Sequence, residues 1–314
     1  MEIIKHPLVS IIVATYNSSN FILETLESIR KQTYTNIELI ITDDYSNDDT
    51  VILCEKWIKK NINRFTNVQI IKSPVNTGIT SNINRGYTAA QGEWIKGIAG
   101  DDALEKDCIS QFVSFVNKHS NACICFSKMN RYKNKFNINN LIEEKTKLPH
   151  CFTTLKPEPY KQFLYLCLRN CISAPTIFMK KELYNSVGGF DNKIRQCEDY
   201  PMWLKITQKG YPFYYLDEST ILYRVHDKSL YGGYQIQNLF KSFFKEENAT
   251  YQNYIKPYAP FAIRITNRYE YYIKLIIEKC NLNKNNPFAK ILYRFLRIPL
   301  KILHVSIICF YKLK

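Results

Sequence analysis

Several short motifs that mark common nucleotide- and metal-binding proteins are missing from this sequence. No G-x-G-x-x-G follows the first predicted strand and no G-x-x-x-x-G-K-S/T occurs. The sequence therefore lacks the main evidence for assigning it to the dinucleotide-binding or the P-loop proteins. The ten cysteines show no zinc-site spacing, and the close pairs Cys123/Cys125 and Cys167/Cys171 are better explained as small buried hydrophobic residues. Because no secretory leader is recognisable, we expect reduced thiols in the cytoplasm.

The composition is that of a folded protein with an excess of positive charge. With 46% hydrophobic and 14% aromatic residues the chain is not disordered, and its 314 residues can bury one large core or two moderate ones. The formal net charge of +15 favours acidic partners, namely nucleic acid, anionic lipid or a phosphorylated substrate. Charge alone does not choose among these three.

Strands and helices alternate along the first third of the chain. Apolar, β-branched runs such as PLVSIIVATY predict strands, and apolar residues at helical spacing predict helices between them. We expect strands at 7–16, 36–44, 67–73 and 93–99, and helices at 17–32, 46–60 and 78–90. Ser46 and Asp49 suit a capping box for the second helix. This alternation predicts an α/β fold with a mostly parallel sheet, which binds ligands at the carboxyl ends of its strands.

The pattern is more mixed in the remainder of the chain. We expect a helix at 105–118, a strand at 122–127, a mobile loop at 130–150, a helix at 197–210, an extended segment at 219–226, and aromatic, basic helices from about 235 onward. No internal repeat or low-complexity block is present. The second part therefore adds mixed structure to the sheet and ends in helices.

Polar side chains follow all four of the first predicted strands, in the segments TYNSS, DDYS, SPVNTG and GDD. These segments should converge, because the carboxyl ends of parallel strands meet at one edge of a sheet. Asp101 and Asp102 are the strongest indication of a ligand, since adjacent carboxylates repel each other unless a cation or a hydrogen-bond donor offsets the cost. A Mg²⁺ or Mn²⁺ ion that bridges a diphosphate would do so, because these ions prefer carboxylate and phosphate oxygens.

In their order and spacing these motifs resemble those of the family-2 glycosyltransferases, which have the GT-A nucleotide-sugar-binding fold. The resemblance runs from about residue 7 to 230, and its marks are VSIIVATYN, SIRKQTYTNIELIITDDYSNDDT, NTGITSNINRGYTAAQGEWI, AGDD, VGGFD, EDYPMWLKITQKGY and YRVH. It implies a GT-A catalytic unit at 1–232, in which a Rossmann-like nucleotide-binding half at 1–102 is fused to an acceptor half with a smaller mixed sheet at 103–232. A helical, basic and aromatic extension at 233–314 would follow this unit.

The resemblance also implies roles for individual residues. Those expected to border the nucleotide are Ala14, Thr15, Tyr16, Asn17, Asn76 and Gly78. Asp44 would accept a hydrogen bond from the uracil ring, Asp101 would face ribose or sugar hydroxyls, and Asp102 would hold Mn²⁺ or Mg²⁺ together with Asp101. Asp199 would be the base that activates the acceptor, with Glu198 among the substrate-binding residues.

Arg224 and His226 lie two residues apart in an extended segment, so their side chains project from the same face. Arg224 could steady the diphosphate, and His226 could complete the metal coordination that Asp102 begins, as the resemblance suggests. A single histidine is more often a hydrogen-bonded structural residue, and this interpretation of His226 stays open.

The sequence departs from the family pattern at two points. The metal motif of the family is often Asp-x-Asp, whereas only the adjacent residues Asp101 and Asp102 are acidic here. Relatives often carry a basic residue at the positions of Ser81 or Ile83, so a phosphate contact of the family is missing at these positions.

The acids at the strand ends have structural alternatives as well. Neighbouring extended residues point to opposite sides, so one of Asp43 and Asp44 could cap the following helix while the other, which we take to be Asp44, faces the ligand. Asp101 and Asp102 could likewise cap the helix at 105–118, although its first turn already carries acidic residues.

Glu198 and Asp199 could be solvated charges on a surface helix. Only one of them can be the base, because consecutive helical residues do not share a face. Four further side chains are assigned either to the core or to stacking on a sugar: Trp94, Met129, Met202 and Trp203.

The segment 290–312 predicts an amphipathic helix. Its basic residues recur every three or four positions and form one stripe, made of Lys290, Arg294, Arg297, Lys301 and His304. The apolar stretch after His304 is shorter than the ~20 residues that span a bilayer, and Pro299 would bend the helix. We favour an interfacial helix on anionic lipid over a helix packed on the catalytic unit, because the apolar arc is wider than one packing surface requires.

Together with the resemblance, these features predict an inverting, metal-dependent glycosyltransferase at the cytoplasmic face of a membrane. It would move a sugar from a nucleotide diphosphate donor, a UDP-sugar, to a hydroxyl of a lipid-linked saccharide during synthesis of a bacterial surface polysaccharide such as O-antigen or capsule.

Two other classes of protein remain as alternatives. A nucleic-acid-binding protein is suggested by the charge of +15 and by the tyrosines among basic residues at 251–274. It leaves the strand-end acids unexplained, since carboxylates repel phosphate backbones, and we expect no nucleic-acid partner. A metal-dependent nucleotidyltransferase would use the same acids but release pyrophosphate.

Overall fold

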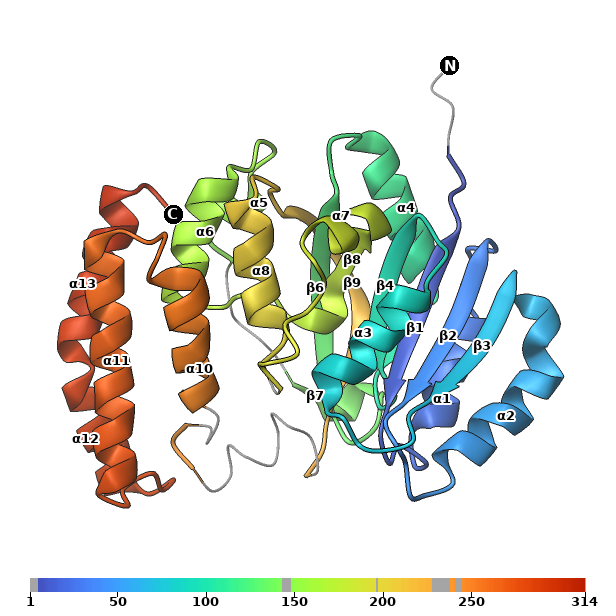
Figure 1. Ribbon diagram of the computed structural model, residues 1–314, viewed down its shortest axis with the longest axis horizontal. Helices are drawn as coiled ribbons and strands as arrows, with labels where there is room; N and C mark the ends of the chain where they lie inside the picture. Colours follow the sequence, from blue (N-terminus) through green and yellow to red (C-terminus); the bar gives the residue numbers. More distant parts are fainter. Residues whose placement is uncertain (1–4, 143–147, 196, 228–237, 241–243, 314) are drawn as a thin grey trace.

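A computed structural model describes residues 5–142, 148–195, 197–227, 238–240 and 244–313 (Figure 1). Its strands are β1 (Val9–Thr15), β2 (Ile37–Asp43), β3 (Asn67–Lys72), β4 (Trp94–Ala99), β5 (Ala103–Leu104), β6 (Ile124–Lys133), β7 (Leu141–Ile142), β8 (Ile177–Lys180) and β9 (Tyr214–Val225). Its α-helices are α1 (Ile22–Arg30), α2 (Thr50–Asn61), α3 (Ile79–Ala89), α4 (Cys108–Lys118), α5 (His150–Thr153), α6 (Pro159–Leu168), α7 (Lys181–Ser186), α8 (Asp199–Gln208), α10 (Phe244–Thr250), α11 (Phe261–Lys279), α12 (Pro287–Leu296) and α13 (Ile298–Phe310). Shorter helical turns are η1 (Ile62–Arg64), η2 (Ile138–Asn140), η3 (Ala174–Thr176) and η4 (Tyr251–Ile255).

The strands of the described residues form one continuous sheet with the order β3-β2-β1-β4-β8-β6-β9-β5, and β7 pairs with β6. The first four strands are parallel neighbours, and the pairing of Val9 with both Ile37 and Trp94 makes them end level with one another. β8 then pairs antiparallel with β4 and β6, which joins the mixed part to the parallel part. The predicted α/β fold is confirmed, and its parallel and mixed parts share one sheet.

β1, β2 and β4 carry buried side chains on both faces of the sheet, since successive side chains of a strand point to opposite sides, whereas the edge strand β3 is only partly buried. Val9, Ile11 and Val13 pack in one core with residues of α1, α2 and α4. Ile12 faces the other side, where its side chain lies so close to Gly86 of α3 that a Cβ added to this glycine would clash with it. Helices therefore cover both faces of the sheet (Figure 1).

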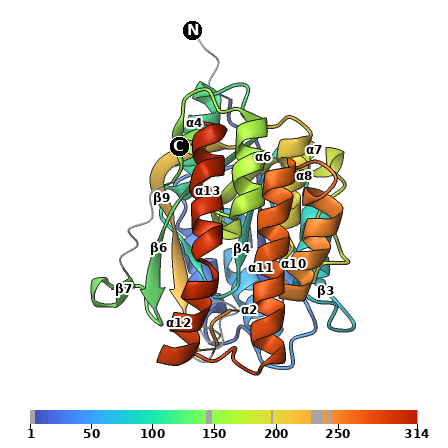
Figure 2. The same cartoon turned by 90° about the vertical axis from the view of Figure 1, so that its left-hand side faces the viewer.

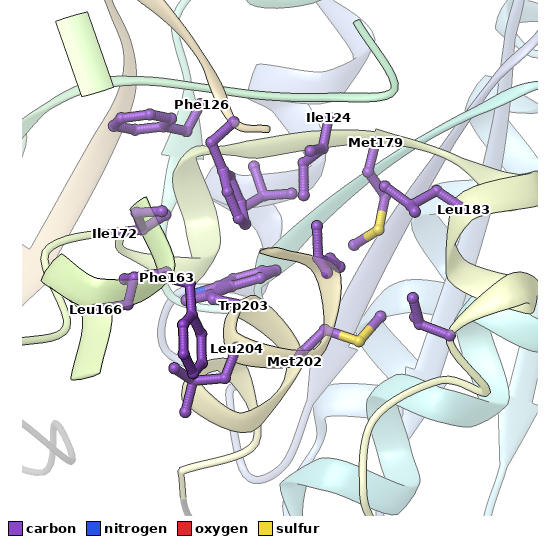
Figure 3. Packing of buried hydrophobic residues seen from close by; sticks show 14 of the residues in the cluster. Ile124, Phe126, Phe163, Leu166, Ile172, Met179, Leu183, Met202, Trp203 and Leu204 are labelled. Atoms are coloured by element: carbon purple, nitrogen blue, oxygen red, sulfur yellow. The ribbon is translucent and has the colours of Figure 1, made fainter. Parts of the chain in front are cut away.

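A further core lies between the mixed part of the sheet and the helices α6 and α8 (Figure 3). Met202 and Trp203 of α8 are at most 1% exposed and pack in the same cluster as Phe163 of α6. Trp94 is also buried, and Met129 is partly buried against the core that includes β1. These side chains therefore belong to the core, and the alternative of sugar stacking is wrong for the three that are buried.

The helices α10 to α13 form an outer layer beside α6 and α8 (Figures 1 and 2). Asn267 of α11 donates to the carbonyl of Cys167 at 2.9 Å, and Gln208 of α8 donates to the carbonyl of Tyr254 at 2.5 Å. In the part of the chain that the structure describes, no helix combines the length and the apolarity of a membrane span.

The predicted capping box of the second helix is wrong. α2 begins at Thr50, and the carboxylate that accepts its backbone N–H at 3.0 Å belongs to Asp48. Asp49 makes no side-chain cap, and Ser46 instead donates to the carboxylate of Asp43, the last residue of β2. The carboxylate of Asp48 is also held by a hydrogen bond from Ser19 N at 3.0 Å, which fixes it beside the start of α2. The local sequence does not reveal this contact.

Two longer segments also differ from expectation. β6 extends to Lys133, because β9 supplies a partner strand for residues that looked like loop, and only part of 130–150 is irregular. The tail forms two helices rather than one, since Pro299 lies in the first turn of α13 and Arg297 separates it from α12. The boundary predicted at residue 232 lies outside the described residues.

Candidate active site

The carboxyl ends of the parallel strands meet at one edge of the sheet. The backbone N–H of Asp44 donates to the carbonyl of Thr15 at 3.0 Å, and that of Gly100 donates to the carbonyl of Ala14 at 2.9 Å. Ser73 N donates in the same way to Asp43 O at 2.9 Å. The polar segments after the strands therefore converge, as the sequence predicted.

Asp43 holds the turn after β2. Its carboxylate accepts from Thr15 Oγ1 at 2.9 Å, from Ser46 N at 2.9 Å and from Ser46 Oγ at 2.5 Å. Its alternative role as a helix cap is therefore wrong, and the contact of Asp44 with a ligand stays a prediction.

Asp44 faces the turn between β3 and α3. It accepts from the backbone N–H of Thr77 at 3.1 Å and of Gly78 at 2.7 Å, and from Arg85 Nη2 at 2.8 Å. Burial would raise the pKa of Asp44, but these hydrogen bonds outweigh it and lower the pKa below the ordinary value. Gly78 has φ 87°, a conformation that favours glycine, and Asn76 is exposed beside it.

The turn after β1 holds the other residues predicted to border a nucleotide. Ala14 is half-buried and Thr15 is buried, whereas Tyr16 is 47% exposed. Asn17 has φ 51°, and its side-chain oxygen accepts from Asn47 N at 2.9 Å, which ties this turn to the one after β2. Tyr16 is thus an exposed aromatic side chain at the same edge as Asp44.

Asp101 and Asp102 follow β4 and are hydrogen-bonded to Arg224 near the end of β9. Asp102 is 2% exposed, and its Oδ1 accepts from Arg224 N at 2.8 Å. Burial and the charge of Asp101 raise the pKa of Asp102 well above its ordinary value. Asp101 Oδ2 lies 3.0 Å from His226 Nε2. Neither acid caps the helix that follows, because β5 intervenes and α4 begins only at Cys108.

The guanidinium of Arg224 is committed to the protein. Nε donates to the carbonyl of Asp101 at 2.7 Å, and the other two nitrogens bond to the carbonyl of Asn134 and the carboxylate of Glu24. The group lies 3.9 Å from the ring centroid of Phe136, and the side chain is 2% exposed. The side chain would have to leave these partners to contact a diphosphate. In the structure Arg224 instead fixes the position of Asp101 and Asp102.

The acids and His226 offer the kinds of atom that a Mn²⁺ or Mg²⁺ ion binds, namely carboxylate oxygen and imidazole nitrogen. Within the described residues no three such side chains form a ready metal site. Asp102 also gives one of its oxygens to Arg224 N. The donor set fits a divalent ion whose coordination is completed by phosphate oxygens of a substrate.

Glu198 and Asp199 lie at the start of α8 and are 7% and 8% exposed, so the alternative of solvated surface charges is wrong. Asp199 accepts from Tyr200 N at 2.7 Å and from Asn170 Nδ2 at 3.5 Å. Burial, followed by the charge of Asp199, raises the pKa of Glu198 to about 8. The raised pKa lets Glu198 keep a proton to a higher pH than an ordinary carboxyl does, and Asp199 remains the proposed proton acceptor of the pair.

Two acids of the C-terminal helices contribute to this environment. Glu246 of α10 adds negative potential at Glu198, and Glu247 does so at Cys197 and Tyr200. Glu247 in turn pairs with Lys274 of α11 at 2.5 Å. The extension after residue 233 therefore reaches the acids of α8, which no local sequence pattern predicts.

Comparison with known families places this geometry in context. The sequence profile described as Glycosyl transferase family 2 matches residues 10–188, which is more than half of the chain. The chain belongs to glycosyltransferase family 2. The resemblance inferred from the sequence motifs is thereby confirmed.

Curated relatives of this family-2 chain align over most of its length. An uncharacterized glycosyltransferase of Rickettsia typhi is 27% identical over 227 residues, which are 70% of this chain and 65% of the relative. The chain thus spans slightly less than two thirds of that relative. The UDP-Glc:alpha-D-GlcNAc-diphosphoundecaprenol beta-1,3-glucosyltransferase WfaP of Escherichia coli is 29% identical over 273 residues, covering 87% of this chain and 96% of WfaP.

Solved structures with the GT-A fold are similar to this family-2 chain. TarS of S. aureus in complex with UDP-GlcNAc has a TM-score of 0.60 at 19% identity, covering 84% of this chain and 71% of the other. The mannosyltransferase PcManGT of Pyrobaculum calidifontis in complex with GDP-Man and Mn²⁺ has a TM-score of 0.55 at 15% identity, covering 96% and 73%. At these identities the similarity shows the GT-A fold.

The contact of Arg85 with Asp44 in the nucleotide half of this family-2 chain was not predicted from the sequence. The family's basic position was sought at Ser81 or Ile83, but α3 instead carries Arg85, whose Nη2 bonds to Asp44 and, at 3.0 Å, to Asn82 Oδ1. The available signal was the helical spacing of three residues from Asn82 to Arg85, which places both side chains on one face.

Proposed function

We propose that this family-2 protein is an inverting glycosyltransferase that moves a sugar from a UDP-sugar to a hydroxyl of a lipid-linked saccharide. The observation that carries the proposal is the acid pair Asp101 and Asp102, which follows β4, is joined by hydrogen bonds to His226 and Arg224, and lies at the strand edge that holds Asp44 and Tyr16. The buried acids at the start of α8 support it. The printed activity of WfaP, which uses UDP-Glc and a diphosphoundecaprenol-linked acceptor, supports the donor and acceptor classes. Synthesis of a bacterial surface polysaccharide is the process we propose.

In the proposed reaction the acceptor hydroxyl oxygen attacks the anomeric carbon while the bond from that carbon to the diphosphate oxygen breaks. Asp199 takes the proton of the hydroxyl, and the electron pair of the broken bond leaves with the nucleoside diphosphate. Asp102, with Asp101 and His226, would hold a divalent ion that offsets the charge developing on the diphosphate. Attack from the side opposite the leaving group inverts the anomeric configuration.

On the nucleotide side, Asp44 would accept from the uracil ring and Tyr16 would lie against the base. Asp44 is ionised, and hydrogen bonds from Arg85 and from the backbone of Gly78 hold its carboxylate in place. The carboxylate would therefore not need to reorient when the nucleotide binds. Thr15, Ala14, Asn17 and Asn76 would border the ribose and the base as parts of the same turns.

A panel of nucleotide sugars, incubated with Mn²⁺ and no acceptor, tests the donor class. We expect slow hydrolysis of one UDP-sugar above that of GDP- and CMP-sugars, with release of UDP, because water can replace the acceptor hydroxyl in the site. Addition of an acceptor should raise that rate. Consumption of a nucleoside triphosphate with release of pyrophosphate would instead identify a nucleotidyltransferase.

The C-terminal helices support the proposal that the protein attaches to the inner face of a membrane. The large apolar side chains of α12 and α13 that are at least 48% exposed include one stripe at helical spacing, made of Phe288, Ile291, Phe295, Ile298, Ile302 and Val305. Each of the five predicted basic residues from Lys290 to His304 directly precedes a member of this stripe, so an exposed apolar band runs beside a basic one.

The tail also packs on the protein, so the two alternatives for it are not exclusive. Leu300 is buried with Ile273 and Ile277 of α11, opposite the exposed stripe. Of the basic residues, Arg297 pairs with Glu270 at 2.9 Å, and burial lowers the pKa of His304. The basic band available to lipid is therefore narrower than the sequence predicted.

Substitution of Ile291 and Phe295 by serine should lower binding to anionic vesicles about tenfold, because both side chains are exposed and would enter the bilayer surface. Vesicle sedimentation measures the change. The control substitutes Ile52 and Ile62 by serine; these side chains are about half exposed, against about two thirds for the tested pair, and lie in α2 and η1. Equal losses in the two pairs would contradict attachment through the tail.

A further inference from the structure

A hollow of about 430 Å³ lies between η4 and the first half of α11, outside the site described above. Its wall includes the cations Lys256, Arg264 and Arg268 and the rings of Tyr251, Phe261 and Tyr272. None of the described residues that line it is acidic. The hollow is therefore positively charged and partly aromatic.

The two arginines of the hollow have no carboxylate partner among the described residues. Arg268 donates to Asn248 Oδ1 at 3.2 Å and to Tyr272 Oη at 2.7 Å, and its guanidinium lies 5.7 Å from the ring centroid of Tyr251. All these partners are neutral, so they leave the positive charge uncompensated.

Arg264 adds an unsatisfied donor. Its Nε is buried and has no hydrogen-bond partner within the described residues, and its guanidinium lies 5.8 Å from the ring centroid of Phe261. A buried donor without a partner is costly, and the described residues of the protein do not satisfy Nε of Arg264. Guanidinium groups bind phosphate through paired hydrogen bonds, so two adjacent arginines favour a phosphate ligand.

An apolar stripe begins at the hollow and runs along α11. It consists of Phe261, Ile265, Tyr269, Tyr272 and Ile276, which follow one another at intervals of three or four residues and are all at least 38% exposed. The opposite side of the helix is buried, at Ile263, Ile273 and Ile277. A ligand with a phosphate head and an apolar chain would match the hollow and the stripe together.

The position of α11 in the molecule supports such a ligand. α11, α12 and α13 form the outermost layer on the side that Figure 2 turns toward the viewer. More than half of the large apolar side chains that are exposed in the described residues lie in 258–310. The stripe of α11 thus belongs to the same exposed layer as the stripe of α12 and α13.

We propose that the hollow binds the phosphate of an anionic phospholipid headgroup, and that the α11 stripe enters the bilayer beside it. Arg264 and Arg268 donate to the phosphate oxygens, and Lys256 at the rim adds a third positive charge. This inference rests on the proposed attachment to a membrane and gives that attachment a defined headgroup site. It is independent of the catalytic acids.

The test compares Arg264→Gln/Arg268→Gln with the unchanged protein in sedimentation with vesicles of phosphatidylcholine, with and without phosphatidylglycerol. We expect the double variant to bind the anionic vesicles about 25-fold more weakly, since each of the two cations near a membrane surface contributes about fivefold. The matched control is Lys279→Gln/Lys284→Gln, which removes the same charge from exposed positions beyond the hollow, and should lose less than about threefold.

Folding and donor binding are checked in the same samples by melting temperature and by calorimetry with UDP. Arg268 also donates to Asn248, so Lys256→Gln/Arg264→Gln serves as a second variant that keeps this contact. We expect its binding to anionic vesicles to fall about 25-fold as well.

Several outcomes would overturn the inference. Equal losses in the hollow pair and the control pair would mean that attraction is spread over the surface. Full displacement from vesicles by inorganic phosphate alone would assign the hollow to free phosphate, and an equal loss of single-stranded RNA binding would assign it to nucleic acid. If the unchanged protein bound no vesicles, the proposal of membrane attachment itself would fail. If it bound vesicles but the hollow pair and the control pair lost equal affinity, only the headgroup site would be rejected.

Discussion

Asp199→Asn should lower glycosyl transfer by ~10²-fold or more while leaving UDP binding within a few-fold of normal. Asparagine keeps the size of the side chain and can still accept from Tyr200 N, which bonds to Asp199 at 2.7 Å, but it takes no proton from the acceptor. The acceptor hydroxyl becomes strongly acidic only as its bond to carbon forms, so a carboxylate of low basicity is sufficient. Transfer assays and calorimetry with UDP separate the two effects.

Glu198→Gln is the matched control for this variant. Because burial and Asp199 raise the pKa of Glu198 and so favour its protonated form, an amide in its place changes the charge of the site less than at an ordinary carboxylate, and we expect a milder loss of transfer. A dead Glu198→Gln beside an active Asp199→Asn would exchange the two roles. A product that keeps the anomeric configuration of the donor would reject direct displacement altogether.

Asp102→Asn should remove the Mn²⁺-dependent part of UDP binding, which we expect to be ~10²-fold in affinity. The introduced amide would still accept from Arg224 N, whereas Asp102→Ala would leave that buried N–H without a partner and cost about 1–3 kcal/mol of stability. Calorimetry with UDP, with and without a chelator, measures the metal-dependent part in both variants.

The pH dependence of the unchanged protein gives an independent readout. Burial and Asp101 raise the pKa of Asp102, so its carboxylate gains a proton as the pH falls and then binds a cation less well. Mn²⁺-dependent UDP binding should therefore weaken as the pH falls through this raised pKa, and Asp102→Asn should lose that dependence. Unchanged affinity in Asp102→Asn would sink the metal assignment, and a partial loss would point to Asp101 or His226 as further ligands.

Arg224 contacts both acids, so a substitution of Arg224 would also disturb Asp101 and Asp102. Its guanidinium bonds to Asp101 and Glu24 and its backbone to Asp102, so it joins β9 to the acid pair. Loss of activity on replacing Arg224 would therefore report on the placement of the acids as much as on any contact with a diphosphate.

The sequence by itself determined the alternation of strands and helices, the family and the convergence of the strand-end segments. These features depend on local periodicity and on the parallel arrangement that alternation imposes, so residues such as Asp44 and Asp101 could be located at the correct edge. The sequence also located Glu198 and Asp199 at the start of a helix, but the pattern of apolar residues in that helix did not predict that the two acids are buried.

Only the tertiary structure decided which partner each polar side chain takes. Arg85 reaches Asp44 from 41 residues away, Arg224 reaches Glu24 from 200 residues away, and Glu246 adds its charge to Glu198 from a helix that looked separate from the catalytic unit. Hydrogen bonds and charges act over a few ångströms of space regardless of separation along the chain, and burial strengthens them by excluding water. For that reason the roles of these groups follow from packing, which periodicity does not encode.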